Sequence, residues 1–143
     1  MPGDLIAKAE TTINAPAAKV WHALVTPADI TLYMFGTTVT SDWREGSPIT
    51  WKGEWKGKPY EDKGVIKTFT PERTLRYTHF SPLSGQPDKP ENYHTVTIEI
   101  TPANTATKVT LSQDGNATDE EKKHSEGNWS QVLAGLKKFV EGK

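Results

Sequence analysis

The sequence predicts an α+β fold in which a curved antiparallel sheet of six to seven strands wraps around one long C-terminal helix, with two short helices after the first strand. Two patterns carry this prediction. From about residue 37 to residue 114, apolar residues recur at every second position, as in strands with one buried face. From residue 118 onward they recur at a helical spacing instead. The terminal helix is the only predicted element long enough to cover the apolar face of the sheet.

The N-terminal third predicts one strand and two short helices. Residues 5–13 alternate well enough for the first strand. Asn14 offers a helix N-cap, and Pro16 suits the first turn that follows it. Pro27 should end this helix, and residues 28–34 should form a second short one.

The middle of the chain predicts a meander of consecutive antiparallel strands. The runs with one apolar face and one Thr/Lys/Glu face are residues 49–55, 75–79, 94–101 and 108–113. The turns between them are short, at residues 56–59, 70–73 and 102–105, which favours antiparallel neighbours. Residues 81–90 contain three prolines and therefore predict a long loop.

The last segment predicts the longest helix. Thr118 and Glu121 form a capping-box pattern, and an apolar stripe follows at Trp129, Val132, Leu133, Leu136 and Val140. The first half of this helix places polar residues, among them Ser125 and Asn128, on the same face. A helix packed along its whole length on a dry core would not carry such a face.

Polar residues also continue the apolar faces of four strands. If each turn is symmetric, strand pairing places Val65, His79, His94 and Gln113 in one row across the sheet. We therefore expect a cavity or wet cleft between sheet and helix, as in small-molecule sites. Its apolar walls would be Trp51, Trp55, Tyr77, Trp129 and Leu133, and its polar end His79, His94, Gln113, Ser125 and Asn128. A solvated rim is the alternative reading of the polar residues.

Composition excludes several classes of function. The 143 residues form one domain over 1–143, with 17 Lys and Arg against 18 Asp and Glu, so the basic footprint of a nucleic-acid binder is missing. No apolar stretch is long enough for a membrane span, and there is no cysteine. We expect a cytoplasmic protein that binds neither nucleic acid nor membrane and needs no cofactor.

Catalytic motifs are not evident. There is no Gly-rich phosphate loop, nucleophile elbow or zinc-protease motif, and Glu61 and Asp62 read as loop carboxylates. Two histidines on adjacent strands could chelate a metal, but no third ligand is spaced to help, so we expect no metal site. If the protein did catalyse a reaction, His79 or His94 would be the candidate base, although no catalytic residue is assigned.

The chain resembles a known pattern over nearly its whole length. The opening Ala15-Pro16-Ala17-Ala18-Lys19-Val20-Trp21-His22-Ala23-Leu24 and the closing Gly127-x-Trp129-x-x-x-Leu133-x-x-Leu136 carry most of the resemblance. The pattern is similar to the START/SRPBCC superfamily with its helix-grip fold. Within that superfamily it is most similar to the family named after the activator of the heat-shock-protein-90 ATPase.

This resemblance implies a deep apolar cavity and a hydrophobic ligand, such as a lipid or a polyketide. The leading hypothesis is a non-catalytic binding protein for a hydrophobic or aromatic small molecule, as a monomer or a homodimer. One alternative is a chaperone-associated module of the stress response, with an exposed apolar patch around Tyr33, Met34 and Phe35. The other is a cyclase- or hydrolase-like enzyme that uses a pocket histidine.

Overall fold

The computed structural model describes residues 5–33, 36–55, 57–80, 89, 93–116 and 118–142. The elements, in chain order, are β1 (Leu5–Ile13), α1 (Ala17–Val25), α2 (Pro27–Tyr33), β2 (Thr38–Ser41), β3 (Pro48–Trp55), β4 (Lys58–Thr70), β5 (Thr74–His79), β6 (His94–Ala103), β7 (Ala106–Asn116) and α3 (Asp119–Glu141). The predicted α+β class, the two short helices after the first strand and the long terminal helix are confirmed.

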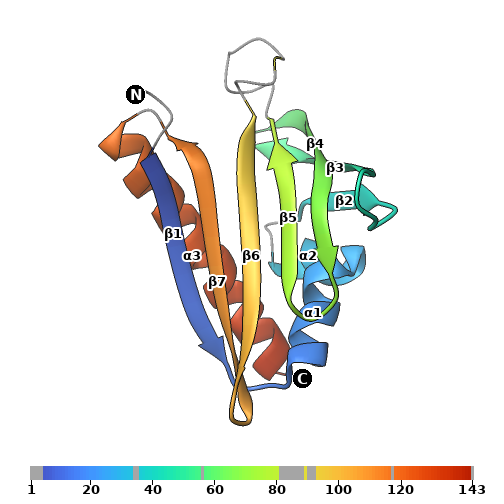
Figure 1. Cartoon of the computed structure of the whole chain (residues 1–143). Coiled ribbons are helices and arrows are strands. Elements are labelled where there is room, and N and C mark those ends of the chain that lie inside the picture. The colour runs from blue at the N-terminus through green and yellow to red at the C-terminus, as the bar shows by residue number, and fades with distance from the viewer. Residues whose placement is uncertain are drawn as a thin grey trace.

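The strands form one seven-stranded antiparallel sheet in the order β1-β7-β6-β5-β4-β3-β2. From β2 to β7 each strand pairs with the next strand along the chain, which confirms the predicted meander. β1 joins the far side by pairing with β7, so β1 and β2 are the two edges. All three helices lie on one side of the sheet (Figure 1).

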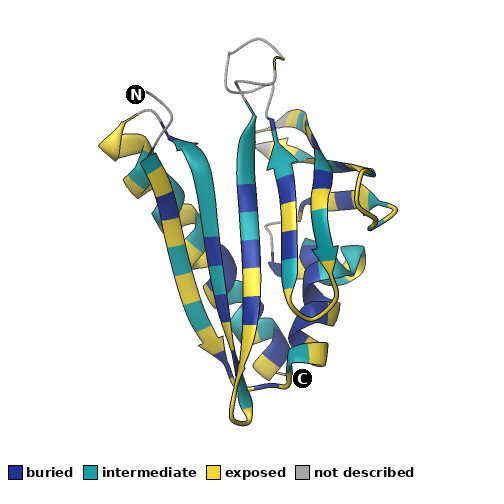
Figure 2. Cartoon of the chain, viewed as in Figure 1, coloured by how far each residue is buried: buried dark blue, intermediate teal, exposed yellow. Residues whose placement is uncertain are grey.

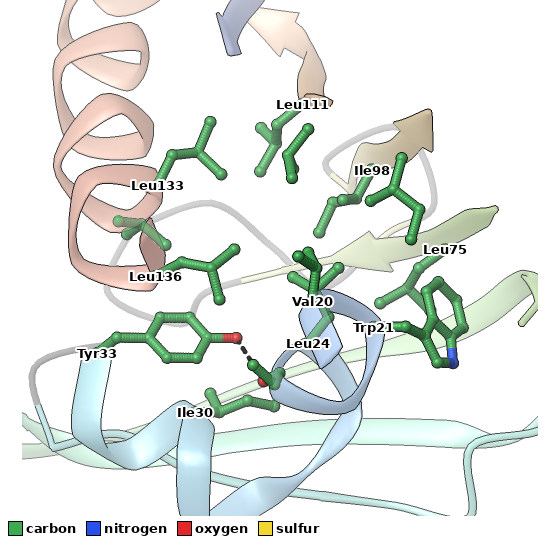
Figure 3. Packing of buried hydrophobic residues seen from close by; sticks show 14 of the residues in the cluster. Val20, Trp21, Leu24, Ile30, Tyr33, Leu75, Ile98, Leu111, Leu133 and Leu136 are labelled. Carbon is green, nitrogen blue, oxygen red and sulfur yellow. Dashed lines mark hydrogen bonds between the residues drawn. The ribbon is translucent and has the colours of Figure 1, made fainter. Parts of the chain in front are cut away.

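The core lies between the inner face of the sheet and the helices. Along β1 and β5, buried and exposed residues alternate as the period-two pattern predicted (Figure 2). In α3 the buried residues are Val132, Leu133, Leu136 and Val140, so only the second half of the helix packs into the core. Leucines from α3 meet side chains of β6, β7, α1 and α2 there (Figure 3).

The start of α1 differs from the prediction. Pro16, not Asn14, stands at the N-cap, and no side chain caps the helix. The backbone N–H of Asn14 instead donates to a carboxylate oxygen of Glu141 at 2.7 Å. α1 ends at Val25 and α2 starts directly at Pro27, because proline fits the first turn of a helix but not its interior.

The start of α3 agrees with the prediction. Thr118 is the N-cap, and its hydroxyl accepts a hydrogen bond from the backbone N–H of Glu121 at 3.1 Å. Three acidic residues in the first turn, Asp119, Glu120 and Glu121, favour the positive end of the helix dipole. Among the described residues, no helix is long and apolar enough to cross a membrane.

Side chains of α3 hold the free edge of β1. The backbone N–H of Lys8 donates to Glu126 at 3.0 Å, and that of Asn14 donates to Glu141. The ammonium group of Lys137 donates to a backbone carbonyl of β1 at 2.7 Å. These bonds satisfy backbone groups that an edge strand otherwise leaves open to pairing with another chain. They also fix α3 along β1, at one side of the sheet.

Candidate functional site

A cavity lies in the core, where the sheet curves away from the helices. Side chains from β2, β3, β5, β6, β7 and all three helices line it, and these side chains are predominantly aliphatic and aromatic. Four of the five predicted wall residues line it, namely Trp51, Tyr77, Trp129 and Leu133. The side chain of the fifth, Trp55, lies outside the described part of the structure.

The cavity is small in this conformation. The atom-free space between its walls is about 460 Å³, including space open to solvent, but the centre of a water molecule can occupy only about 40 Å³ of it. One water needs about 10–15 Å³ on that measure, while a cavity that binds benzene has about 150 Å³. The deep cavity implied by the resemblance is therefore present in outline but largely closed.

Aromatic rings of the sheet close one side of the cavity. The centroid of the Trp51 ring lies 5.1 Å from that of Tyr77 and 5.0 Å from that of His79. Trp51 is on β3 and the other two are on β5, so the indole extends across β4. On β4, Asp62 pairs with Trp51 and Gly64 pairs with Ile49. A Cβ at Gly64 would lie 1.7 Å from the carbonyl oxygen of Thr78.

A buried carboxylate lies beside His79 and was missed by the sequence analysis. Nε2 of His79 lies 2.9 Å from Oδ2 of Asp62, and the two side chains are 29% and 15% exposed. The other oxygen, Oδ1, is buried and has no hydrogen-bond partner. The expectation that Asp62 is a loop carboxylate is wrong, because it lies in β4, opposite Trp51. Counting in twos back from buried Ile66 would have placed it on the inner face.

One pairing in the predicted row of polar residues is correct, and another is displaced by two residues. His79 pairs with His94, as expected. Gln113 pairs with Val96 rather than with His94. The hairpin turn is centred one residue later than the symmetric reading of 102–105, since Ala103 pairs with Ala106. Moving a turn by one residue moves the register by two, so the side chains keep their faces but not their partners.

The pairing of β4 with β5 at His79 also differs from the predicted row. The pairs on either side of it, Lys63 with Phe80 and Ile66 with Tyr77, place Gly64 rather than Val65 opposite His79. The sequence predicted Val65 in the row, although the pairing sum of this hairpin also allowed Gly64.

His94 and Gln113 each bind a specific partner. Nδ1 of His94 donates to the carbonyl oxygen of Asp114 at 2.9 Å, and its ring occupies the space above Gly115, where a Cβ would lie 2.5 Å from that nitrogen. Oε1 of Gln113 accepts a hydrogen bond from the indole N–H of Trp129 at 2.5 Å. Gln113 therefore orients Trp129, one of the cavity walls.

The predicted polar residues of α3 do not reach the cavity. The hydroxyl of Ser125 donates to Oδ1 of Asn116, whose amide donates to the carbonyl oxygens of Leu5 and Gln113. Asn116 is 2% exposed, so this network joins β1, β7 and α3 in the interior. Asn128 is exposed. The predicted polar end thus separates into a pair on β4 and β5 and a structural network at the start of α3.

Two buried tyrosines line the cavity, and burial raises the pKa of both phenols above the ordinary value. For Tyr33, nearby Tyr77 and Asp29 raise the pKa further. The hydroxyl of Tyr33 donates to the carbonyl oxygen of Ala23 at 3.0 Å (Figure 3). Both phenols remain protonated at physiological pH.

Within the described ranges, no group of three or more His, Asp or Glu side chains is placed to hold a metal ion. The predicted apolar patch around Tyr33 is not formed by Tyr33 itself, which is buried, and Met34 and Phe35 lie outside the described residues. Among described residues, the large exposed hydrophobic side chains are Ile6 and Leu32.

The fold and this cavity agree with a sequence-family match. The family described as Activator of Hsp90 ATPase homolog 1-like protein matches residues 14–141. The chain belongs to this family. Its fold is the predicted helix-grip fold. No curated protein matches the chain.

Solved structures place this Activator of Hsp90 ATPase homolog 1-like chain among similar folds. A solution structure of a Cytophaga hutchinsonii protein is 60% identical, with a TM-score of 0.87, covering 99% of this chain and 97% of that one. The Aha1 dimer from Colwellia psychrerythraea is 18% identical, with a TM-score of 0.74 and 96% of each chain covered. Ara h 8.0201 is 13% identical, with a TM-score of 0.77, covering 97% of this chain and 99% of that one. The last two show the fold alone.

Proposed function

We propose that this protein binds a small hydrophobic or aromatic molecule in the cavity between sheet and α3, without catalysing a reaction. The observation that carries the proposal is the cavity itself, which lies at the centre of an otherwise packed core and is lined by Trp51, Tyr77 and Trp129. Close-packed interiors have few voids larger than a water molecule, so an aromatic-lined void is a feature that packing alone does not require.

Binding requires the walls to separate. About 40 Å³ holds a few water molecules, whereas ligand pockets usually measure about 300–1,000 Å³. α3 is fixed to β1 and β7 and touches α1 and α2. The other wall is β3 and β5, whose aromatic rings can change rotamer without breaking backbone bonds. Rotation of Trp51 away from Tyr77 would join the cavity to the space beside His79.

The His79–Asp62 pair would then supply a polar end to the widened site. Its buried Oδ1 has a free acceptor position, which a hydroxyl or amine of a ligand could fill. A free acceptor oxygen suits the binding of a ligand, and we assign the pair to that role rather than to hydrolysis or cyclisation.

A ligand screen with a matched pair of variants tests the proposal. Native mass spectrometry and thermal shift against lipids, polyketides and small aromatic ketones should identify a stabilising ligand. Leu133→Phe places extra volume in the cavity and should abolish that binding. Leu32→Phe adds the same volume at a 70% exposed position of α2 and should leave it unchanged.

The same screen separates the proposal from its alternative. A ligand that still binds Leu133→Phe with wild-type affinity lies elsewhere, and the cavity proposal fails. If no ligand binds but a heat-shock-protein-90 chaperone captures the purified protein, the chaperone-associated module is correct instead. Amide chemical shifts on titration should change first around Trp51, Tyr77 and Trp129.

A further inference from the structure

Tyr77 presents a phenol hydroxyl in the apolar cavity. Tyr77 is 6% exposed and lines the cavity. Its ring contacts Trp51, and its hydroxyl has no hydrogen bond to any described residue. Tyr33, the other buried tyrosine of the cavity, donates its hydroxyl hydrogen to Ala23. Among described residues, the fully buried side-chain atom without a partner is Oδ1 of Asp62, so the hydroxyl of Tyr77 is not sealed from solvent and a small molecule can reach it.

Tyr77 offers a donor rather than a charge. Burial keeps its phenol protonated, so the group presents an O–H bond to the cavity. The walls around it are apolar apart from the hydroxyl of Tyr33, which donates to Ala23 and forms no hydrogen bond with Tyr77. His79 and Asp62 are not among the residues that line the cavity, and they bind each other. The hydrogen of the Tyr77 hydroxyl is therefore available to an acceptor atom of a molecule in the cavity, a water molecule or a ligand.

We propose that the ligand is an apolar molecule with a carbonyl or ether oxygen, and that the hydroxyl of Tyr77 donates a hydrogen bond to this oxygen. This inference rests on the proposed function. Tyr77 lies on β5, and the centroid of its ring is 5.1 Å from that of Trp51, so the ligand oxygen would lie beside an aromatic part of the wall. A fully saturated hydrocarbon would leave the hydroxyl unpaired and would bind less well.

Two probes of the same shape test this proposal. Acetophenone carries a carbonyl oxygen, and α-methylstyrene has a methylene group in the same place. Dissociation constants for both are measured by titration of the wild-type chain, of Tyr77→Phe and of Tyr33→Phe, with far-UV circular dichroism as a folding control. Tyr77→Phe removes only the hydroxyl and keeps the ring. Tyr33→Phe is the matched control, because its hydroxyl is already bonded within the protein.

We expect Tyr77→Phe to weaken acetophenone binding about tenfold, the equivalent of one buried hydrogen bond, and to change α-methylstyrene binding less than twofold. Tyr33→Phe should leave the ratio of the two dissociation constants at its wild-type value. Equal weakening of both probes by Tyr77→Phe would overturn the hydrogen bond while the cavity remained a binding site. If neither probe binds the wild-type chain, the proposed function fails for molecules of this class, and this inference fails with it.

A measurement on the wild-type chain gives the same answer without a variant. The carbonyl stretching band of ¹³C-labelled acetophenone should move to lower frequency in the complex, as it does when the oxygen accepts a hydrogen bond. A bound ketone whose band stays at its frequency in an apolar solvent would overturn the proposal. This readout also decides the matter if Tyr77→Phe does not fold.

Discussion

Replacing Leu133 by alanine should destabilise the protein by about 4 kcal/mol. Leu133 is 2% exposed, projects from α3 into the core near Leu111 and Leu136, and lines the cavity (Figure 3). The substitution removes three buried carbons, which at about 0.8 kcal/mol each amounts to about 2.4 kcal/mol of lost burial. The remainder comes from the void, because measured leucine-to-alanine changes cost about 2.7–5.0 kcal/mol and more where the site cannot collapse.

The position of Leu133 favours a loss of free energy of unfolding in the upper part of that range. The new void joins an existing space of about 40 Å³, whose aromatic walls already fail to close it. Alanine is the best helix former, so α3 itself loses nothing from the change. Urea unfolding followed by fluorescence of the buried tryptophans gives the free energy of unfolding of wild type and variant. A chain of 143 residues is short enough for a two-state treatment, to be checked with a second probe.

Leu32→Ala is the matched control. Leu32 is also a helical leucine, but it lies on α2 and is 70% exposed, so its replacement should change the free energy of unfolding by less than about 0.5 kcal/mol. A loss of less than about 1 kcal/mol for Leu133→Ala, or equal losses for both variants, would refute the description of the cavity as a rigid part of the core. Leu133→Ala should also bind small apolar probes more tightly than the wild type, since its cavity is larger.

Two further predictions concern a pair of glycines and a pH dependence. Gly64→Ala should prevent folding or lower the midpoint of thermal unfolding by tens of degrees, because its Cβ would meet the backbone oxygen of Thr78 at 1.7 Å. Gly127→Ala is the control: its Cβ meets nothing within 4 Å in α3, so it should raise the free energy of unfolding by about 1 kcal/mol. Equal effects of the two substitutions would contradict the prediction. Hydrogen bonds, chiefly from Lys137, lower the pKa of Glu141 below its ordinary value of 4.5. The stability that this carboxylate contributes is therefore present above pH 4.5 and lost as pH falls through the lowered pKa. The difference in free energy of unfolding between wild type and Glu141→Gln should shrink below pH 4.5. A difference that does not change with pH would count against the hydrogen bond from Lys137.

Residues whose role depends on local pattern were predictable from the sequence. Thr118 caps α3 as its spacing to Glu121 indicated, and His79 pairs with His94 because both lie on strands of regular alternation. Asp62 was misread because a carboxylate seldom lies on the inner face of a sheet, so its residue type outweighed its position. The register of Gln113 was displaced because the centre of a turn cannot be read to one residue from sequence.

The sequence by itself determined the apolar faces of the strands and the apolar stripe of α3, since strand and helix periods follow from backbone geometry and need no knowledge of the partner. Only the tertiary structure decided how closely those side chains pack. The gap beneath α3 depends on the curvature of the sheet and on the rotamer of Trp51, both of which are set by contacts between residues far apart in the chain. For the same reason, the bond between Trp129 and Gln113 and the unpaired hydroxyl of Tyr77 appear only in three dimensions.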